Sequence, residues 1–262
     1  MCKRLSNSIC VAVVCALIVG GCAPESGPKA DVLAVGPKLE ALAVPSEYAA
    51  LAIRAAGGFD AWANAKKIDL DCVATFYQED GTYYLTEQRY EVFPWSNSVR
   101  ISGAEPGGEY SRRLLEGRFS VLEGKSQYDG LQVGVDNGCI ADGILNLITA
   151  PARLLDESVK YTWSTEPVRI KGQWYRPVKR LAKIGAPGTV NVREGAFYQK
   201  RSSGRVDMVL LGCGGTEDVL IVRGHDYRLL GKGGVMVPSK IEAFKADASN
   251  RVRHRIIEID LK

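Results

Sequence analysis

Apolar and polar residues alternate with a period of two from Ile68 onward, which is the pattern of β-strands with one buried face. The first run, residues 68–77, is followed by Asp80-Gly81, a dipeptide that favours a tight hairpin turn, and a second run occupies residues 83–93. Comparable turn signals recur about every 8 to 12 residues along the chain. This spacing predicts an antiparallel meander that forms a large twisted sheet or an incomplete barrel rather than alternating βαβ units.

Further strand candidates extend to the end of the chain. They are residues 98–103, 110–115, 118–123, 160–164, 168–170, 173–184, 189–194, 196–199, 207–211, 219–224, 226–229, 237–245 and 251–261. In the last run, residues 251–261, charged and apolar residues alternate after Ile257. We therefore expect this strand to have one solvent-exposed face and one buried face. No linker or internal repeat divides the chain. We therefore expect a single α+β domain, mainly β, over residues 46–262.

Four short helices are expected beside these strands. The first begins after Ser46, which can cap it, and ends at Gly57-Gly58, and a second follows directly. In the middle of the chain, Asp142 can cap a third helix, and Pro151 suits the first turn of a fourth. The two central helices are strongly apolar, so we expect them to lie against the concave face of the sheet.

The N-terminus has the three parts of a secretory signal. Lys3 and Arg4 precede an uncharged apolar run, Ile9 to Val19, and Gly20-Gly21 provides a small-residue cleavage site. The run of 11 residues is too short to cross a membrane, because a spanning helix needs roughly 20 apolar residues. We therefore expect a signal peptide at residues 1–21.

The residue after the cleavage site is a cysteine, and this arrangement resembles the lipobox of bacterial lipoproteins. The resemblance implies cleavage between Gly21 and Cys22 and attachment of a diacylglycerol to the Cys22 thiol, with residues 22–45 as a flexible tether. Ala23, rather than aspartate, follows the cysteine, and the enterobacterial sorting rule then implies the outer membrane. The alternative is an ordinary secreted protein, or an uncleaved anchor, in which the cysteine is incidental.

The remaining cysteines permit one disulfide at most. Three of the seven cysteines lie in the signal and Cys22 is the lipid site, which leaves Cys72, Cys139 and Cys213. A bridge between Cys139 and Cys213 is favoured because both lie in glycine-rich turns. The alternative for each is a small buried apolar residue.

The sequence offers little that indicates catalysis, a cofactor or a nucleic-acid partner. The formal charge of +4 is spread without a sustained basic patch, and no nucleophile elbow, P-loop or zinc-binding motif occurs. The two histidines, His225 and His254, are interpreted as half-buried strand residues, so no catalytic residue, metal site or cofactor is predicted. The pair Arg112-Arg113 could meet phosphate headgroups, but a solvated strand face is the favoured interpretation.

The order of the elements resembles the LolA/LolB-like family of periplasmic lipoprotein-sorting proteins and their lipid-binding relatives. Two short segments contribute to the resemblance, residues 56–62 (AGGFDAW) and 234–238 (GVMVP). The family has a curved antiparallel half-barrel, helices that act as its lid, and acyl chains in the apolar space between them. No loop residue matches the family's functional positions, so none is transferred.

The resemblance implies a membrane-anchored periplasmic lipoprotein that binds a lipid or a lipoprotein acyl chain and takes part in lipid or lipoprotein trafficking. Its expected partners are the membrane, through the N-terminal lipid, an apolar small molecule or acyl chain, and another envelope protein. Six residues are candidates for the lining of the cavity: Phe76, Tyr84, Tyr90, Ile144, Leu147 and Ile148. The alternative is a non-catalytic envelope scaffold or interaction protein whose sheet is filled by its own side chains.

Overall fold

The computed structural model describes residues 47–130, 133–156, 161–180, 195–213, 218–230 and 234–262. Several sequence-based predictions lie outside these ranges. They are the signal, Cys22, the tether, Ser46, residue 160 of the strand predicted at 160–164, residues 181–184 of the strand predicted at 173–184 and the whole strand at 189–194.

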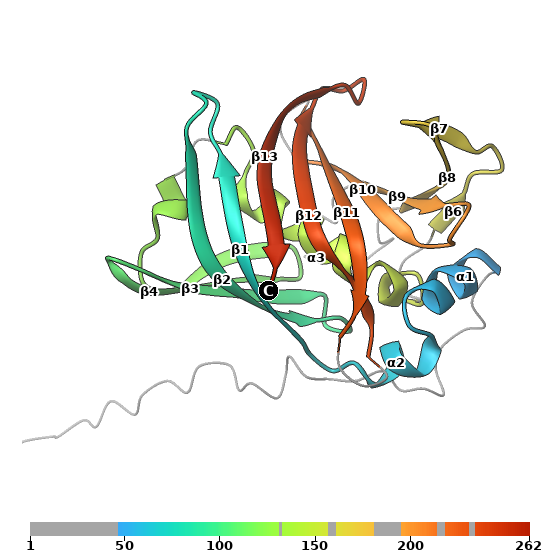
Figure 1. Cartoon of the computed structure of the whole chain (residues 1–262), viewed down its shortest axis with the longest axis horizontal. Helices are drawn as coiled ribbons and strands as arrows, with labels where there is room; N and C mark the ends of the chain where they lie inside the picture. The colour runs from blue at the N-terminus through green and yellow to red at the C-terminus, as the bar shows by residue number, and fades with distance from the viewer. Residues whose placement is uncertain (1–46, 131–132, 157–160, 181–194, 214–217, 231–233) are drawn as a thin grey trace, which may run out of the picture.

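The described residues form an open antiparallel sheet of thirteen strands, and this confirms the predicted fold class. The strands are β1 (Ile68–Tyr77), β2 (Tyr83–Phe93), β3 (Ser98–Glu105), β4 (Gly108–Leu115), β5 (Arg118–Glu123), β6 (Tyr161–Trp163), β7 (Val168–Ile170), β8 (Gln173–Arg180), β9 (Gly195–Lys200), β10 (Val206–Gly212), β11 (Val219–Leu229), β12 (Met236–Ala246) and β13 (Val252–Leu261). Their spatial order is β5-β4-β3-β2-β1-β13-β12-β11-β10-β9-β8-β6, and β7 pairs with β8. The first and last strands therefore meet in the middle of the sheet, in the register Cys72↔Leu261 to Phe76↔Ile257 (Figure 1).

Two predicted strands are one continuous strand. We expected residues 219–224 and 226–229 to be separate, but β11 runs through both. Asp226 has a φ of 50°, and yet the pairing with β12 keeps one register from His225↔Lys240 to Tyr227↔Pro238. The polar residues His225 and Asp226 suggested that the strand ends there. Hydrogen bonding to β12 keeps β11 extended through these two residues.

The N-terminal helices close one corner of the sheet. They are α1 (Glu47–Ala55) and α2 (Phe59–Asn64). Trp62 is fully buried, and its indole N–H donates to the Ala56 carbonyl at 2.9 Å. The Met236 N–H donates to the same carbonyl at 2.8 Å. Between the helices, Gly57 has a φ of 113°, and a Cβ there would lie 2.8 Å from the Gly234 carbonyl oxygen. The two segments that contribute to the family resemblance are therefore in direct contact.

The centre of the chain forms one long helix, α3 (Asn137–Arg153), instead of the two that we predicted. Its N-cap is Asp136, whose carboxylate accepts from the backbone N–H groups of Gly138 and Cys139 at 3.1 and 3.0 Å. Asp142 is a buried residue inside the helix, so the predicted cap was wrong. Pro151 lies in the last turn, where the helix continues for only two more residues, and its missing N–H removes a single helical bond.

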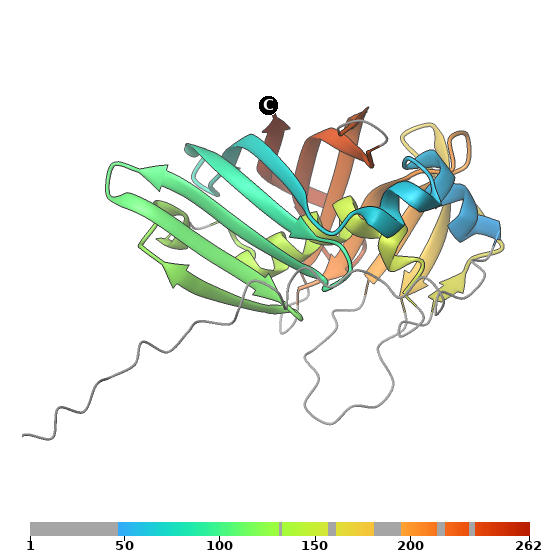
Figure 2. The same ribbon diagram turned by 90° about the horizontal axis from the view of Figure 1, so that it is seen from below.

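The helix α3 lies inside the curve of the sheet (Figure 2). It contacts β10, β11 and β12 on one side and β3, β4 and β5 on the other. Sixteen of its 17 residues are buried, as expected for a helix with apolar material all round. Gly143 permits the close approach to β11, because a Cβ at this position would lie 2.6 Å from Leu220 Cδ2. No helix in the described ranges is long and apolar enough to span a bilayer.

Candidate functional site

The six predicted lining residues lie in or beside the main apolar core, which α3 shares with the sheet. Five of them, all except Tyr84, are buried members of one apolar cluster. Tyr84 packs against the edge of this cluster, with its ring 6.2 Å from that of Phe76. The residues come from β1, β2 and α3. In this conformation α3 is buried in the same cluster, so the helix occupies the place that the sequence analysis assigned to a ligand.

A disulfide joins Cys139 to Cys213, with 5.6 Å between their Cα atoms. The pair is the one that the sequence favoured. Cys139 lies in the first turn of α3, and Cys213 follows the end of β10, so the bridge ties the helix to the sheet. Cys72 remains a thiol within the core, where burial raises its pKa to about 12. A thiol with so high a pKa is an inert core residue at neutral pH.

The C-terminal end of α3 is attached to neighbouring segments of the chain by hydrogen bonds of Arg153. The Arg153 guanidinium donates to the Pro94 carbonyl, and the Tyr161 hydroxyl donates to the Arg153 carbonyl at 2.8 Å. The helix is therefore held covalently near its N-terminus and by hydrogen bonds at its C-terminus.

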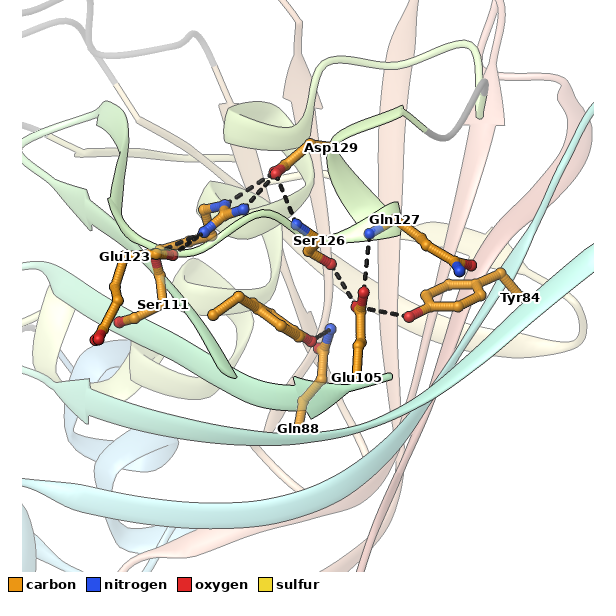
Figure 3. A network of polar contacts seen from close by, with 10 residues as sticks. Tyr84, Gln88, Glu105, Ser111, Glu123, Ser126, Gln127 and Asp129 are labelled. Carbon is orange, nitrogen blue, oxygen red and sulfur yellow. Dashed lines mark hydrogen bonds and ion pairs between the residues drawn. The ribbon is translucent and has the colours of Figure 1, made fainter. Parts of the chain in front are cut away.

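A fully buried arginine lies inside the half-barrel beneath β4 and β5. Arg112 Nε donates to Asp129 Oδ1 at 2.8 Å, and its Nη2 donates to the other carboxylate oxygen. Its Nη1 donates to the carbonyls of Ser111 and Glu123 at 2.9 and 2.7 Å (Figure 3). The hydrogen bonds from Arg112 hold the pKa of Asp129 below its usual value. This pair fastens the 3₁₀ turn Gln127–Gly130 against the sheet.

The interpretation of Arg112 as part of a solvated strand face was therefore wrong. The residue alternates with Tyr110 and Leu114, and all three face the interior of the half-barrel. This alternation was the available signal in the sequence, but a charged side chain is rarely fully buried unless it is paired. Its partner, Asp129, lies 17 residues away in a turn that no periodic pattern identifies.

A second carboxylate fastens the same turn. Glu105, at the end of β3, accepts hydrogen bonds from the hydroxyls of Tyr84 and Ser126 and from the backbone N–H of Gln127. Burial disfavours the charged form of Glu105, but these hydrogen bonds outweigh it, and its pKa is lowered. Burial and the hydrogen bond to Glu105 raise the pKa of Tyr84 to about 12. The predicted lining residue Tyr84 thus belongs to a polar network (Figure 3).

The network continues across the sheet through Gln88. Its amide nitrogen donates to the Tyr110 hydroxyl at 3.0 Å, and its amide oxygen accepts from the Tyr90 hydroxyl at 3.0 Å. Burial raises the pKa of Tyr110. These contacts satisfy the polar tips of aromatic residues that the apolar core surrounds.

A groove opens next to this network, where β2 and β3 separate. Its volume is about 1170 Å³, and β1 to β4 supply most of its walls. Tyr84, Gln88, Glu105 and Tyr110 line it from the network side. The sequence analysis did not predict this feature.

The part of the chain that the structure describes contains no group of three His, Cys, Asp or Glu side chains placed to hold a metal ion. The two histidines lie apart and have separate neighbours. His225 Nε2 lies 3.1 Å from a Glu242 carboxylate oxygen, and His254 Nε2 lies 3.4 Å from the Val133 carbonyl.

Comparison of sequences found no match to a protein-family model and no match to a curated protein. Comparison of structures found similar folds. A LolA superfamily protein from Nitrosomonas europaea is 14% identical, with a TM-score of 0.52 over 84% of this chain and 92% of its own. A DUF1329 family protein from Desulfovibrio piger is 11% identical, with a TM-score of 0.45 over 82% of this chain and 90% of its own. An outer membrane lipoprotein-sorting protein domain from Vibrio parahaemolyticus is 8% identical, with a TM-score of 0.40 over 74% of this chain and 82% of its own. The first of these comparisons shows that the chain has a LolA-like fold.

Proposed function

We propose that this protein is a cell-envelope lipoprotein, anchored through Cys22 on the periplasmic face of the outer membrane, that binds an acyl chain or another apolar ligand in its half-barrel. One observation carries the proposal. The concave face of the sheet and the helix α3 meet in a single apolar cluster, so movement of the helix would expose two apolar surfaces that a ligand chain can cover.

The way in which α3 is held supports this proposal. The disulfide fixes its first turn to the sheet, whereas hydrogen bonds hold its C-terminal end. Hydrogen bonds can exchange partners on a functional timescale, and a disulfide cannot. The helix then pivots near Cys139 and opens at Arg153. An acyl chain of about 16 carbons gains on the order of 10 kcal/mol when it leaves water, which can replace the contacts that the helix gives up.

The burial of α3 supports a second function. Sixteen of its 17 residues are buried, which is the arrangement expected if the half-barrel is permanently filled. The protein would then be an envelope scaffold or interaction module that binds no lipid inside its fold. The two functions differ in what happens when lipid is added to the purified protein. A lipid-binding protein gains the mass of the bound lipid, whereas a scaffold keeps its own mass.

Native mass spectrometry distinguishes the two functions. The chain from Ala23 onward is exported with a signal that leaves it unlipidated, and it is mixed with palmitate or with phosphatidylethanolamine. We expect complexes whose mass increases by one bound lipid, because the apolar surfaces around α3 take up the acyl chain. Glycerophosphoethanolamine, which has the headgroup without acyl chains, is the control and should not bind. A protein that keeps its apo mass at saturating lipid would contradict lipid binding and favour the scaffold.

The anchor has its own test. Replacement of Cys22 by alanine should move the protein from the membrane pellet to the soluble fraction, because the thiol that accepts the lipid is lost. Cys15→Ala, within the signal, is the matched control and should leave the protein in the pellet. The fractions are measured by immunoblotting, and a mass spectrum of the N-terminal peptide identifies the lipid. Retention of Cys22→Ala in the membrane would contradict anchoring at this residue.

A further inference from the structure

The strands β2 and β3 pair along only half of β2. Their register runs from Phe93↔Ser98 to Gln88↔Gly103, whereas β1 and β2 remain paired up to Tyr77↔Tyr83. Residues 83–87 of β2 therefore have no strand-pairing partner in β3 within the described ranges, and only the side chain of Tyr84 reaches across to β3, where its hydroxyl donates to Glu105. Figure 1 shows the reason: the β1–β2 hairpin turns away from the β3–β4 hairpin.

In the β1–β2 pair, the residues whose backbone groups bond to the neighbouring strand alternate along β2. This alternation identifies the β2 backbone groups that have no hydrogen-bonding strand beside them. The Gln78 N–H donates to the Thr82 carbonyl at 2.9 Å at the end of the hairpin. In an antiparallel pair, bonded residues recur every second position. Even-numbered residues of β2 therefore bond to β1, and the backbone groups of Tyr83, Leu85 and Glu87 point to the opposite side. Among the described residues, no backbone group bonds to Tyr83 or Leu85 on that side.

The groove of about 1170 Å³ lies along this unpaired edge. Its walls carry six carboxylates and three cationic side chains. The carboxylates are those of Asp71, Glu87, Glu91, Glu105, Glu109 and Glu123, and the cationic groups are those of Arg89, Arg100 and Lys262.

The negative charge of the groove is only partly neutralised. Each cationic group lies against a carboxylate of the wall, as Lys262 does with Glu87 at 2.7 Å. Glu109 and Glu123 are exposed, and neither carboxylate has a cationic partner among the residues that the structure describes. The groove therefore carries excess negative charge beside an open strand edge.

The same edge exposes large apolar side chains. Tyr83 and Leu85 are 68% and 55% exposed. An open backbone edge, apolar side chains at alternate positions and a groove beside them are the features by which a sheet accepts an added strand. The excess of carboxylates selects a strand with positive charge.

We propose that residues 83–87 of β2 form a docking edge for an extended segment of a partner protein that carries lysine or arginine side chains. The segment adds to the sheet in the gap between β2 and β3, with its backbone bonded to Leu85 and its cationic groups facing Glu109 and Glu123. This site is separate from the apolar cluster around α3, and it does not depend on lipid binding.

Peptide binding to the full chain tests the proposal. The probe is a labelled peptide of about eight residues that alternates lysine with valine and threonine, and the readout is fluorescence anisotropy. We expect binding that weakens as salt increases, and protection of the Leu85 amide from hydrogen exchange when the peptide is bound. A peptide with glutamate in place of lysine should bind at least about tenfold more weakly.

Substitutions separate the backbone contribution from that of charge. Leu85→Pro removes the outward N–H and leaves the bonds to β1 intact, so we expect at least about a tenfold loss of affinity. Leu85→Thr keeps the N–H and should bind within about threefold of the wild type. Glu109→Lys with Glu123→Lys should abolish the salt dependence. Glu166→Lys, in the exposed turn before β7, is the matched charge control and should bind as the wild type does.

Three results would overturn the proposal. One is equal binding of the lysine and glutamate peptides, and another is unchanged binding by Leu85→Pro with a wild-type melting temperature. The third is full protection of the Leu85 amide before any peptide is added, which would mean that the chain covers this edge itself.

Discussion

Replacing Cys139 and Cys213 together by alanine should lower the free energy of unfolding by about 4 kcal/mol. The bridge closes a loop with a sequence separation of 74 residues, and the chain-entropy relation for a loop of that length gives this value. The bridge also holds α3 inside the sheet. The loss should therefore appear in urea unfolding as a lower midpoint, and hydrogen exchange should increase throughout the helix.

Two controls make this result specific to the disulfide. Reductant should destabilise the wild type and leave the double variant unchanged, because only the wild type has a bond to reduce. Cys72→Ala, which removes the buried thiol and no bridge, should lower the free energy by about 1 kcal/mol. Equal stability of the wild type and the double variant would contradict a structural role for the bridge.

Replacing Arg112 by methionine should lower the free energy of unfolding by about 3 kcal/mol. The side chain is fully buried, and its loss removes the donors of two backbone carbonyls and leaves the Asp129 carboxylate with only the Ser126 backbone N–H at 3.2 Å. Breaking a buried ion pair costs about 3 to 5 kcal/mol. We expect the low end because the Asp129 side chain is 36% exposed and solvent can screen it. Urea unfolding measures the change, and hydrogen exchange should increase in the turn at residues 126–130.

The matched control is Arg113→Met, the neighbouring arginine on the opposite face of β4. Its effect should be within about 0.5 kcal/mol, as for most substitutions outside the core. Adding Asp129→Leu to Arg112→Met should recover part of the loss, since no charge then remains unpaired. Equal effects of Arg112→Met and Arg113→Met would show that the buried pair contributes nothing.

The dependence of this effect on pH has a definite sign. The folded-state pKa of Asp129 is lowered, chiefly by its hydrogen bonds from Arg112. The resulting stabilisation is complete above the unfolded pKa, about 3.9, and is lost as the pH falls through the lower folded value. The difference in stability between the wild type and Arg112→Met should therefore shrink below about pH 4. A difference that stays constant down to pH 2 would contradict this assignment.

Local patterns predicted most of the strands but misjudged the centre of the chain. From Ile68 to Tyr77, burial alternates along the strand in the structure as apolar and polar residues do in the sequence. The reason is that successive side chains of a strand point to opposite faces of the sheet. The segment around Pro151 was divided into two helices because proline commonly begins a helix. A proline in the last turn removes only one hydrogen bond of the helix. The apolar contacts of α3 with the surrounding sheet then keep residues 137–153 as one helix.

Several features could be predicted from the sequence alone: the period-two strands, the hairpin turn after β1, the N-terminal corner around Trp62 and the pairing of Cys139 with Cys213. The strands, the turns and the corner depend on backbone geometry and on contacts between residues that are near one another in the chain, whereas the cysteine pair, 74 residues apart, was favoured because few cysteines remain and both lie among glycines. Three features could not be predicted from local patterns and appear only in the folded chain: α3 fills the half-barrel, Arg112 lies in the interior, and β2 and β3 separate beside a groove. Those three features follow from the curvature of the sheet, which arises from the twist accumulated over many strands and is not encoded in any one segment.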